Sequence, residues 1–434
     1  MIFLKKYSDV FMCERDFHEK MACDIVKPQQ RMFSGAVKVP QPFYLYQDMQ
    51  FGAGELIETL PEQDKEFNEK KRLCVKFENT YRELLNTELN PDLCKRWLRR
   101  KKQVGCCGNL LDFQGDKLAA TLFCHVRLCP MCAWRRAIKI CMHTRMILDK
   151  MMSDEGKKFK FLFLTLTVPN VKDDELAGEI THLMQSWRKM THVSKNVRSI
   201  VPNQFNQKVL GWYRGLEITR NQDMYQVDYV YDSSTGKKIK VPKIGQDGFA
   251  MLNPNFLTWH PHFHNILVVP ADMPEADLAE LLTIRDSKGR IVKESCFLDW
   301  WRWATGDSSI TQVDCKEFRP SAKVLRNKEY QKKYSANELL SMAIVSGVAE
   351  AAKYTVKATD YYLDADATKI LDLALERRQL VAYGGIMSKY RNLLKLDDEI
   401  DGDLVASSMT PEDLNAVRRT YAFSVGFNCY VRIR

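Results

Sequence analysis

Three of the chain's eight histidines lie close together in the stretch WHPHFHNILVVP, residues 259–270. His260, His262 and His264 alternate with other residues, and the Phe, Ile, Leu and Val around them are typical of a buried strand. Side chains two residues apart on a strand share a face, so His262 and His264 are neighbours and His260 lies beyond them. One buried histidine is usually a core residue with a hydrogen-bond partner. Three at this spacing need a partner for every ring nitrogen, which favours a bound metal ion.

A third ligand is expected on a neighbouring strand. The segment GWYRGLEITR places Glu217 between Leu216 and Ile218 in a strand-like pattern. An acid in that setting faces either a partner or water. Glu217 is therefore a candidate ligand, and the alternative is an outward residue on a solvated sheet face.

A second pattern that could do chemistry is SGVAEAAKYTVKATDYY. Its residues Glu350, Tyr354, Lys357 and Tyr361 are spaced four, three and four apart, which puts them on one face of a predicted helix over about 336–358 and just beyond. Aromatic residues at this spacing are more often core residues, but a stripe of Glu, Tyr, Lys and Tyr is seldom buried in a hydrophobic core. A tyrosine oxygen can act as a nucleophile when a metal or a base assists it.

Cysteines form the third pattern. Cys129 and Cys132 make a C-x-x-C motif, Cys124 precedes it, and Cys106 or Cys107 lies about twenty residues upstream. Four thiolates make a closed structural zinc site, and Cys107 is preferred because Gly108 can turn the chain toward the metal. The alternatives are a redox pair or ordinary buried thiols. Thirteen scattered cysteines without an export signal indicate reduced thiols and a cytoplasmic protein.

The positive charge of the chain is concentrated in one segment. Residues 95–150 hold 13 Lys and Arg against 3 Asp and Glu, which accounts for the whole net charge of +10. Such a block favours nucleic acid as a partner over a merely solvated surface. Arg127, Arg135 and Arg136, beside the cysteines, are the predicted DNA-binding residues. No run of eighteen apolar residues occurs, so neither a membrane span nor a membrane partner is expected.

The elements that must position these residues alternate between strands and helices of varied length, with hairpins among them. This predicts an α+β fold with a central antiparallel sheet and helices. The predicted regions are an N-terminal arm and helical region (1–100), a basic Cys-rich segment (101–150), a catalytic domain (155–363, with a hairpin insertion at 222–258) and a C-terminal region (364–434).

Three motifs, in order, resemble those of rolling-circle plasmid replication initiators of Gram-positive bacteria, within the HUH endonuclease superfamily. They are FLFLTLTVPNV, HPHFHNILVV and AEAAKYTVKATDYY, and FCHVRLCPMCAWRRA resembles the cysteine segment that precedes the catalytic domain. The resemblance covers residues from about 105 to 363. About forty residues separate Glu217 from His260, which is long for a compact member.

The resemblance implies an HUH endonuclease-like catalytic domain that nicks and joins DNA through a 5′-phosphotyrosine. It implies that His262, His264 and Glu217 hold Mg²⁺ or Mn²⁺, with His260 the extra histidine of this branch. Tyr354 matches the nucleophile, Glu350 the acid that lets water cleave at termination, and Lys357 the lysine that follows the tyrosine.

The implied partners are the plasmid's double-strand origin, its single-stranded nick site, and a host helicase with other replication proteins. Tyr361 or Tyr362 as a second nucleophile stays open. A transposase or mobilisation relaxase of the same superfamily, and a non-catalytic zinc-containing DNA-binding repressor, are the alternatives.

Overall fold

The computed structural model describes residues 58–433 except 156–157, 193–199, 233–236, 320–327, 335–338, 340–342, 345, 348–360, 363, 397–403, 406–412 and 414. Two predictions fall outside these described residues. They are the irregular arm at the N-terminus and the part of the helix that carries Glu350, Tyr354 and Lys357.

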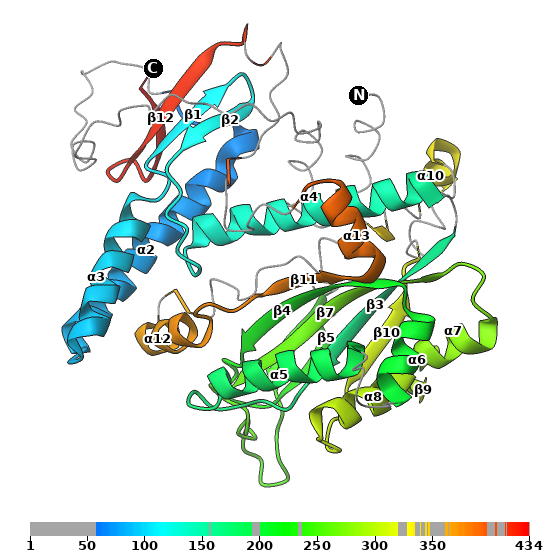
Figure 1. Cartoon of the computed structure of the whole chain (residues 1–434). Helices are drawn as coiled ribbons and strands as arrows, with labels where there is room; N and C mark the ends of the chain where they lie inside the picture. The colour runs from blue at the N-terminus through cyan, green and yellow to red at the C-terminus, as the bar shows by residue number, and fades with distance from the viewer. Residues whose placement is uncertain are drawn as a thin grey trace.

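A five-stranded antiparallel sheet, called the central sheet below, lies in the lower right part of the molecule in Figure 1. Its central strand is the histidine strand, which pairs on both sides over most of its length. Together with the surrounding helices it confirms the predicted α+β class with an antiparallel sheet. In spatial order the strands are β10 (Val313–Glu317), β3 (Phe159–Thr167), β7 (Trp259–Pro270), β4 (Gly211–Arg220) and β11 (Val381–Gly384).

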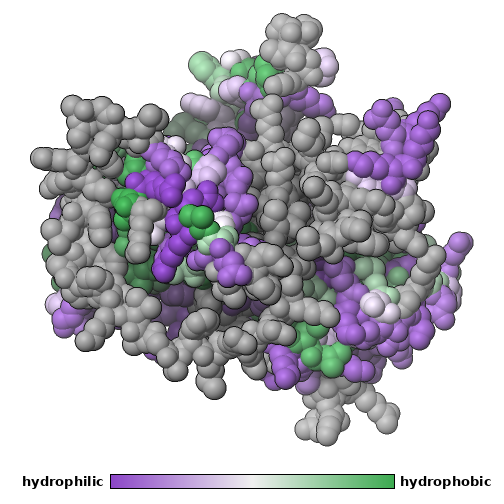
Figure 2. Space-filling model, turned by 90° about the horizontal axis from the view of Figure 1, so that it is seen from above, coloured by the Kyte–Doolittle hydropathy of each residue, from purple (hydrophilic) through white to green (hydrophobic). Residues whose placement is uncertain are grey.

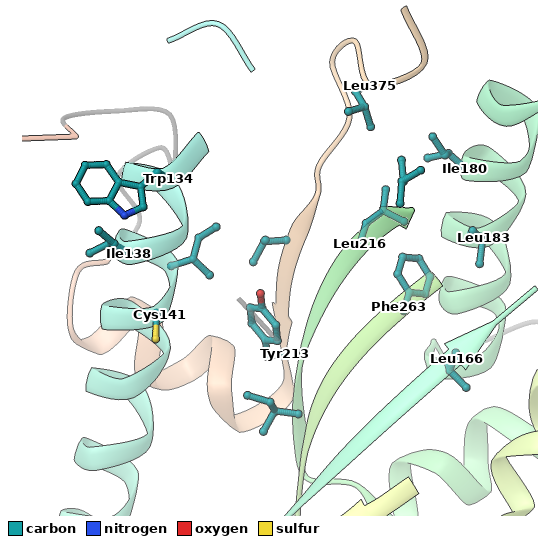
Figure 3. Close-up of a cluster of buried hydrophobic side chains, with 14 of the residues drawn as sticks. Trp134, Ile138, Cys141, Leu166, Ile180, Leu183, Tyr213, Leu216, Phe263 and Leu375 are labelled. Atoms are coloured by element: carbon teal, nitrogen blue, oxygen red, sulfur yellow. The ribbon is translucent and has the colours of Figure 1, made fainter. Parts of the chain in front are cut away.

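Helices cover both faces of this sheet, because apolar side chains of its strands alternate between the two sides. Leu166, Leu216 and Phe263 point toward α5, whereas Tyr213 points the other way, toward α4 (Figure 3). The helices are α5 (Leu176–Thr191), α6 (Ile200–Lys208) and α8 (Cys296–Thr305) on one side, and α4 (Pro130–Glu155) and α13 (Gly385–Leu393) on the other.

A second, four-stranded sheet joins the Cys-rich segment to the end of the chain. The predicted terminal strand pattern forms a hairpin, and it pairs with a hairpin at 110–121 that the sequence reading missed. Because β11 lies in the central sheet, the chain after residue 364 contributes to both sheets. The second sheet holds β13 (Cys429–Arg432), β12 (Arg418–Ser424), β1 (Leu110–Gln114) and β2 (Lys117–Thr121). Helix α2 (Lys65–Thr87) packs against this sheet and against α3 (Pro91–Cys106), and α12 (Ala365–Ala374) contacts α2 and α5.

Between β4 and β7 the chain forms the expected hairpin, which is a separate two-stranded ribbon. The ribbon consists of β5 (Val227–Asp232) and β6 (Lys237–Pro242). The remaining short elements are η4 (Glu62–Asp64), α7 (Glu275–Leu281), β8 (Ile284–Arg285), β9 (Ile291–Lys293) and α10 (Lys328–Lys333).

Within the described part of the chain, no helix combines the length and the apolar character needed to cross a bilayer.

Candidate functional site

The strand register brings the predicted metal ligands together. Glu217 on β4 lies directly opposite His262 on β7, and His264 lies two residues further along β7 on the same face. One carboxylate oxygen and two imidazole nitrogens from these residues lie within 4.8 Å of one another. The structure therefore contains a His-His-Glu group that could bind a metal ion.

The ring orientations suit a cation between the three side chains. Nε2 of His264 lies 2.9 Å from Oε2 of Glu217, and Nε2 of His262 lies 3.6 Å from the same oxygen. Nδ1 of His262 lies 3.0 Å from the backbone carbonyl oxygen of His260. A carbonyl oxygen only accepts, so Nδ1 of His262 donates to it and Nε2 is the ring atom that faces Glu217. An imidazole nitrogen and a carboxylate oxygen face each other favourably when a proton or a metal ion lies between them, so the donor set fits a divalent ion.

The group is largely removed from solvent. Glu217 and His262 are both buried, and His264 is half-buried. Burial by itself opposes ionisation, but the hydrogen bonds and charges of His262 and His264 outweigh it and hold the pKa of Glu217 well below its usual range. Glu217 is therefore a carboxylate at neutral pH, which is the form that binds cations.

Neighbouring residues on β3 and β4 surround His264. The hydroxyl of Thr165 lies 3.2 Å from its Nδ1, and the Phe163 ring stacks on it at 5.4 Å. The residue opposite His264 on β4 is the buried Gly215, which contributes no side chain to the group. Polar groups thus occupy this end of the face, whereas its other end packs under α4 and α13.

His260 is placed differently from the other two histidines. Its ring stacks on His262 at 5.1 Å, but it is not a member of the three-residue group. Burial and the nearby His262 ring lower the pKa of His260 to about 4, so it is neutral at physiological pH. A ligand role for His260 stays a prediction, while its backbone carbonyl orients His262.

A second group could also bind a metal ion. The sulfur atoms of Cys107, Cys124, Cys129 and Cys132 lie within 4.8 Å of one another, whereas Cys106 is not part of this group. Gly108 has φ +62°, the left-handed conformation that a turn after Cys107 requires. Although burial opposes it, hydrogen bonds from the Cys107, Cys124 and Cys132 thiols lower the pKa of Cys129 to about 6. Four converging thiols, one of them readily ionised, fit a closed tetrahedral zinc site.

Helix α2 places two residues against this group that the sequence spacing did not indicate. The Cys74 sulfur lies 3.5 Å from that of Cys129, and both are fully buried. The ammonium of Lys71 is also buried, and it donates to the carbonyl oxygens of Gly105 and Cys107 at 2.9 Å. A buried cation at this position offsets the negative charge of thiolates. Cys74 lies 33 residues before Cys107 in a different helix, so no local motif marks it.

We predict that the full-length protein contains about one zinc ion per chain. Cys107→Ser should remove most of it and lower the midpoint of thermal unfolding, because binding at such sites contributes directly to folding. Cys106→Ser is the matched control, since it changes the adjacent thiol outside the group. Elemental analysis of both variants checks the assignment, and equal zinc loss in both would contradict it.

The three arginines predicted to bind DNA have partners inside the protein. Arg127 donates to the carbonyl oxygens of Leu375 and Arg378, and Arg135 to that of Leu404. Arg136 is buried and donates to carbonyl oxygens of the loop that precedes α4. These contacts join the Cys-rich segment to the end of the chain. A DNA contact by these three residues therefore stays a prediction.

The exposed charge of the basic segment lies instead on α3. Lys95, Arg99 and Lys102 are exposed at spacings of four and three, which puts them on one helical face. Viewed from above, the described part of the surface is mostly hydrophilic, and its apolar patches are small and separate (Figure 2). This surface suits a polar or charged partner.

The two tyrosines that follow the predicted nucleophile, Tyr361 and Tyr362, make hydrogen bonds within the protein. Tyr361 is 1 % exposed, its ring packs against Phe77 at 5.4 Å, and its hydroxyl donates to the Leu128 carbonyl oxygen at 2.6 Å. The carbonyl oxygen of Tyr362 accepts from the Thr80 hydroxyl. A buried, hydrogen-bonded Tyr361 hydroxyl is poorly placed to attack DNA.

Tyr361→Phe is expected to lower the free energy of unfolding by about 1 kcal/mol, because it removes one buried hydrogen bond. Any covalent protein–DNA adduct should be retained. Urea denaturation measures the first effect and a denaturing gel the second. Loss of the adduct in a variant with near-normal stability would give Tyr361 a catalytic role.

The fold and site define an α+β protein with two candidate metal centres, a thiol group and a His-His-Glu group. The profile of the Replication protein family matches residues 115–430, which include the Glu217 and His262–His264 region and most of the Cys-rich segment. The chain belongs to this family.

Curated relatives agree with this assignment and with the predicted resemblance to replication initiators of Gram-positive bacteria. A "Protein rep" of Bacillus amyloliquefaciens is 29% identical over 71% of this chain and 76% of its own length. One from Bacillus sp is 28% identical over 71% and 85%, and one from Streptococcus pneumoniae is 25% identical over 81% and 87%. No solved structure matches the chain.

Proposed function

We propose that this replication protein initiates rolling-circle replication of a plasmid. It does so by cutting one DNA strand at the origin with Tyr354 and later rejoining it. The single observation that supports this most is the His262–His264–Glu217 group on adjacent strands of an antiparallel sheet, in a chain of the Replication protein family. This arrangement is the one expected for an HUH-type domain.

His262, His264 and Glu217 would hold Mg²⁺ or Mn²⁺, which would supply Lewis-acid chemistry at the scissile phosphate. Two imidazole nitrogens among three ligands favour Mn²⁺ in affinity, whereas Mg²⁺ usually prefers oxygen ligands. His262 and His264 present Nε2 to the site because His260 and Thr165 hold their Nδ1 atoms. Glu217 contributes the negative charge.

The Tyr354 hydroxyl oxygen attacks the phosphorus, and the bond from phosphorus to the 3′ oxygen breaks. The tyrosine proton is lost to solvent or a base, and the leaving 3′ oxygen takes up a proton. The products are a 5′-phosphotyrosine and a free 3′-hydroxyl that can prime synthesis. Because one phosphodiester replaces another, no nucleoside triphosphate is needed.

Residues before and after Tyr354 in the sequence make contacts near the His-His-Glu group. On one side, Gly347 packs so closely on the Phe318 ring that an added Cβ would lie 1.6 Å from it. Phe318 contacts Phe163, and Phe163 stacks on His264. Tyr354 is seven residues from Gly347, a span of at most about 25 Å.

On the other side, the chain beyond Tyr354 is joined to the end of β4. Asp364 forms an ion pair with Arg220 at 2.5 Å, and Arg220 lies three residues after Glu217. The intervening Tyr361, seven residues after Tyr354, is fixed against Leu128. The two anchors limit how far along the chain Tyr354 can lie from the site, and this limit supports its assignment.

Glu350 and Lys357 complete the proposed site. An acid one helical turn before the tyrosine can align a water molecule that cleaves the DNA at the end of a round. A lysine one turn after it can offset phosphate charge. Origin DNA and host replication proteins, a helicase among them, are the proposed partners.

The direct test uses the full-length protein and a single-stranded oligonucleotide from the origin of the plasmid that encodes it. With Mn²⁺ present, a 3′-end-labelled substrate should yield a labelled band at the mass of protein plus DNA on a denaturing gel. The band should disappear with a chelator. A folded, zinc-containing protein that gives no adduct with either ion would contradict the proposal.

A further inference from the structure

The β5–β6 ribbon carries two exposed tyrosines on one face. Tyr229 is 67% exposed and Tyr231 is 64% exposed. They lie two residues apart on β5, so their side chains point the same way and are about 7 Å apart along the strand. Large exposed aromatic side chains on a soluble protein commonly mark a binding surface.

The strand opposite the tyrosines supplies positive charge on the same face. Lys240 lies directly opposite Tyr229, and Lys238 lies directly opposite Tyr231. Cross-strand pairs place their Cβ atoms about 5 Å apart, so each tyrosine has a lysine as its direct neighbour on the same face. Residues 227–242 contain three lysines and two aspartates, so the ribbon carries a net positive charge of one.

The other face of the ribbon is different in character. Val230 lies opposite Ile239, and these side chains are 49% and 45% exposed. The ribbon is a two-stranded sheet that pairs with no further strand among the described residues. Only the tyrosine face combines aromatic rings with cations.

The ribbon is connected to the end of the central sheet that carries the His-His-Glu group. Backbone hydrogen bonds continue from β4 and β7 into the insertion, from Asn221 to Thr258, from Leu257 to Asn221 and from Gln226 to Met251. Tyr229 follows Glu217 by twelve residues, so the chain limits their separation to at most about 40 Å. That is roughly one helical turn of B-form DNA.

We propose that the tyrosine face of the β5–β6 ribbon binds single-stranded DNA next to the nick site. Tyr229 and Tyr231 stack on bases, and Lys238 and Lys240 contact phosphates. Aromatic rings with interleaved cations are the features that bind single strands independently of sequence, because every base offers a stacking face. Lys240 also pairs with Asp223, which holds it on this face, whereas Lys238 has no acidic partner among the described residues. The position near the cleavage site rests on the proposed function, but strand binding by the ribbon does not.

The test measures binding without cleavage. A fluorescein-labelled dT oligonucleotide about 30 nucleotides long is titrated with full-length protein in a chelator, and binding is followed by anisotropy. The double variant Tyr229→Ala, Tyr231→Ala should bind at least about tenfold more weakly, because the two lost stacking contacts together cost more than a tenfold change in affinity. Tyr229→Phe, Tyr231→Phe should bind like the wild type, since it keeps the rings.

The matched control is Val230→Ser, Ile239→Ser, which alters the other face at comparable exposure. It should leave binding within about twofold, and all variants should keep their zinc content and thermal midpoint. Unchanged binding in the alanine variant, an equal loss in the control, or a loss for a dA·dT duplex as large as for the single strand would overturn the inference. Because no adduct is measured, a protein that fails to nick DNA can still pass this test.

Discussion

Tyr354→Phe should abolish the covalent protein–DNA adduct, with a loss of at least about 10³-fold in cleavage. Phenylalanine keeps the ring and lacks only the oxygen that attacks phosphorus. The fold should not change, so zinc content, thermal midpoint and oligonucleotide binding in a chelator should match the wild type. The measurement is the labelled band on a denaturing gel, followed by peptide mapping of the adduct in the wild type.

Tyr361→Phe and Tyr362→Phe are the matched controls for this variant. The buried hydroxyl of Tyr361 donates a hydrogen bond to the Leu128 carbonyl oxygen. Removing this hydroxyl should therefore leave the adduct in place. An adduct that persists in Tyr354→Phe and maps to Tyr361 or Tyr362 would show that this residue is the nucleophile. Glu350 would then have no water to align at the reacting phosphate.

The sequence predicted the parts of the site that depend on local periodicity. Alternation of His262 and His264 sets a shared face whatever the neighbouring strands are, because the period of a strand is two. The left-handed conformation at Gly108 and the C-x-x-C spacing likewise depend on a few adjacent residues. These features agree with the groups that the structure brings together.

Features that depend on long-range strand pairing could not be predicted from the sequence. That Glu217 lies directly opposite His262 depends on the register of β4 against β7, which are joined through about forty residues. Strand β11 has only four residues and follows a helical segment, so its pattern was too short to read. Arg127 and Arg135 were assigned to DNA on charge, whereas their carbonyl partners come from the distant end of the chain.

His264→Ala should weaken Mn²⁺ binding at the His-His-Glu group by at least about 100-fold, because removing a direct ligand costs more than removing a residue that merely orients one. His262→Ala should have a similar effect, and Glu217→Gln should weaken binding by removing the charge while keeping the shape. Calorimetric titration of the zinc-loaded, full-length protein measures the affinity without reference to DNA cleavage. Adduct formation should fall in parallel, and full cleavage by either histidine variant would contradict the assignment.

His260→Ala distinguishes a three-residue group from a larger one. The backbone carbonyl oxygen of His260, which orients His262, is unchanged by this substitution, and only the stacked ring is lost. Since the His260 ring does not belong to the group of converging ligand atoms, the affinity for Mn²⁺ should fall by less than about tenfold. A loss as large as that of His264→Ala would show that the His260 ring binds the ion directly, which would require the ring to turn away from its stacked position on His262.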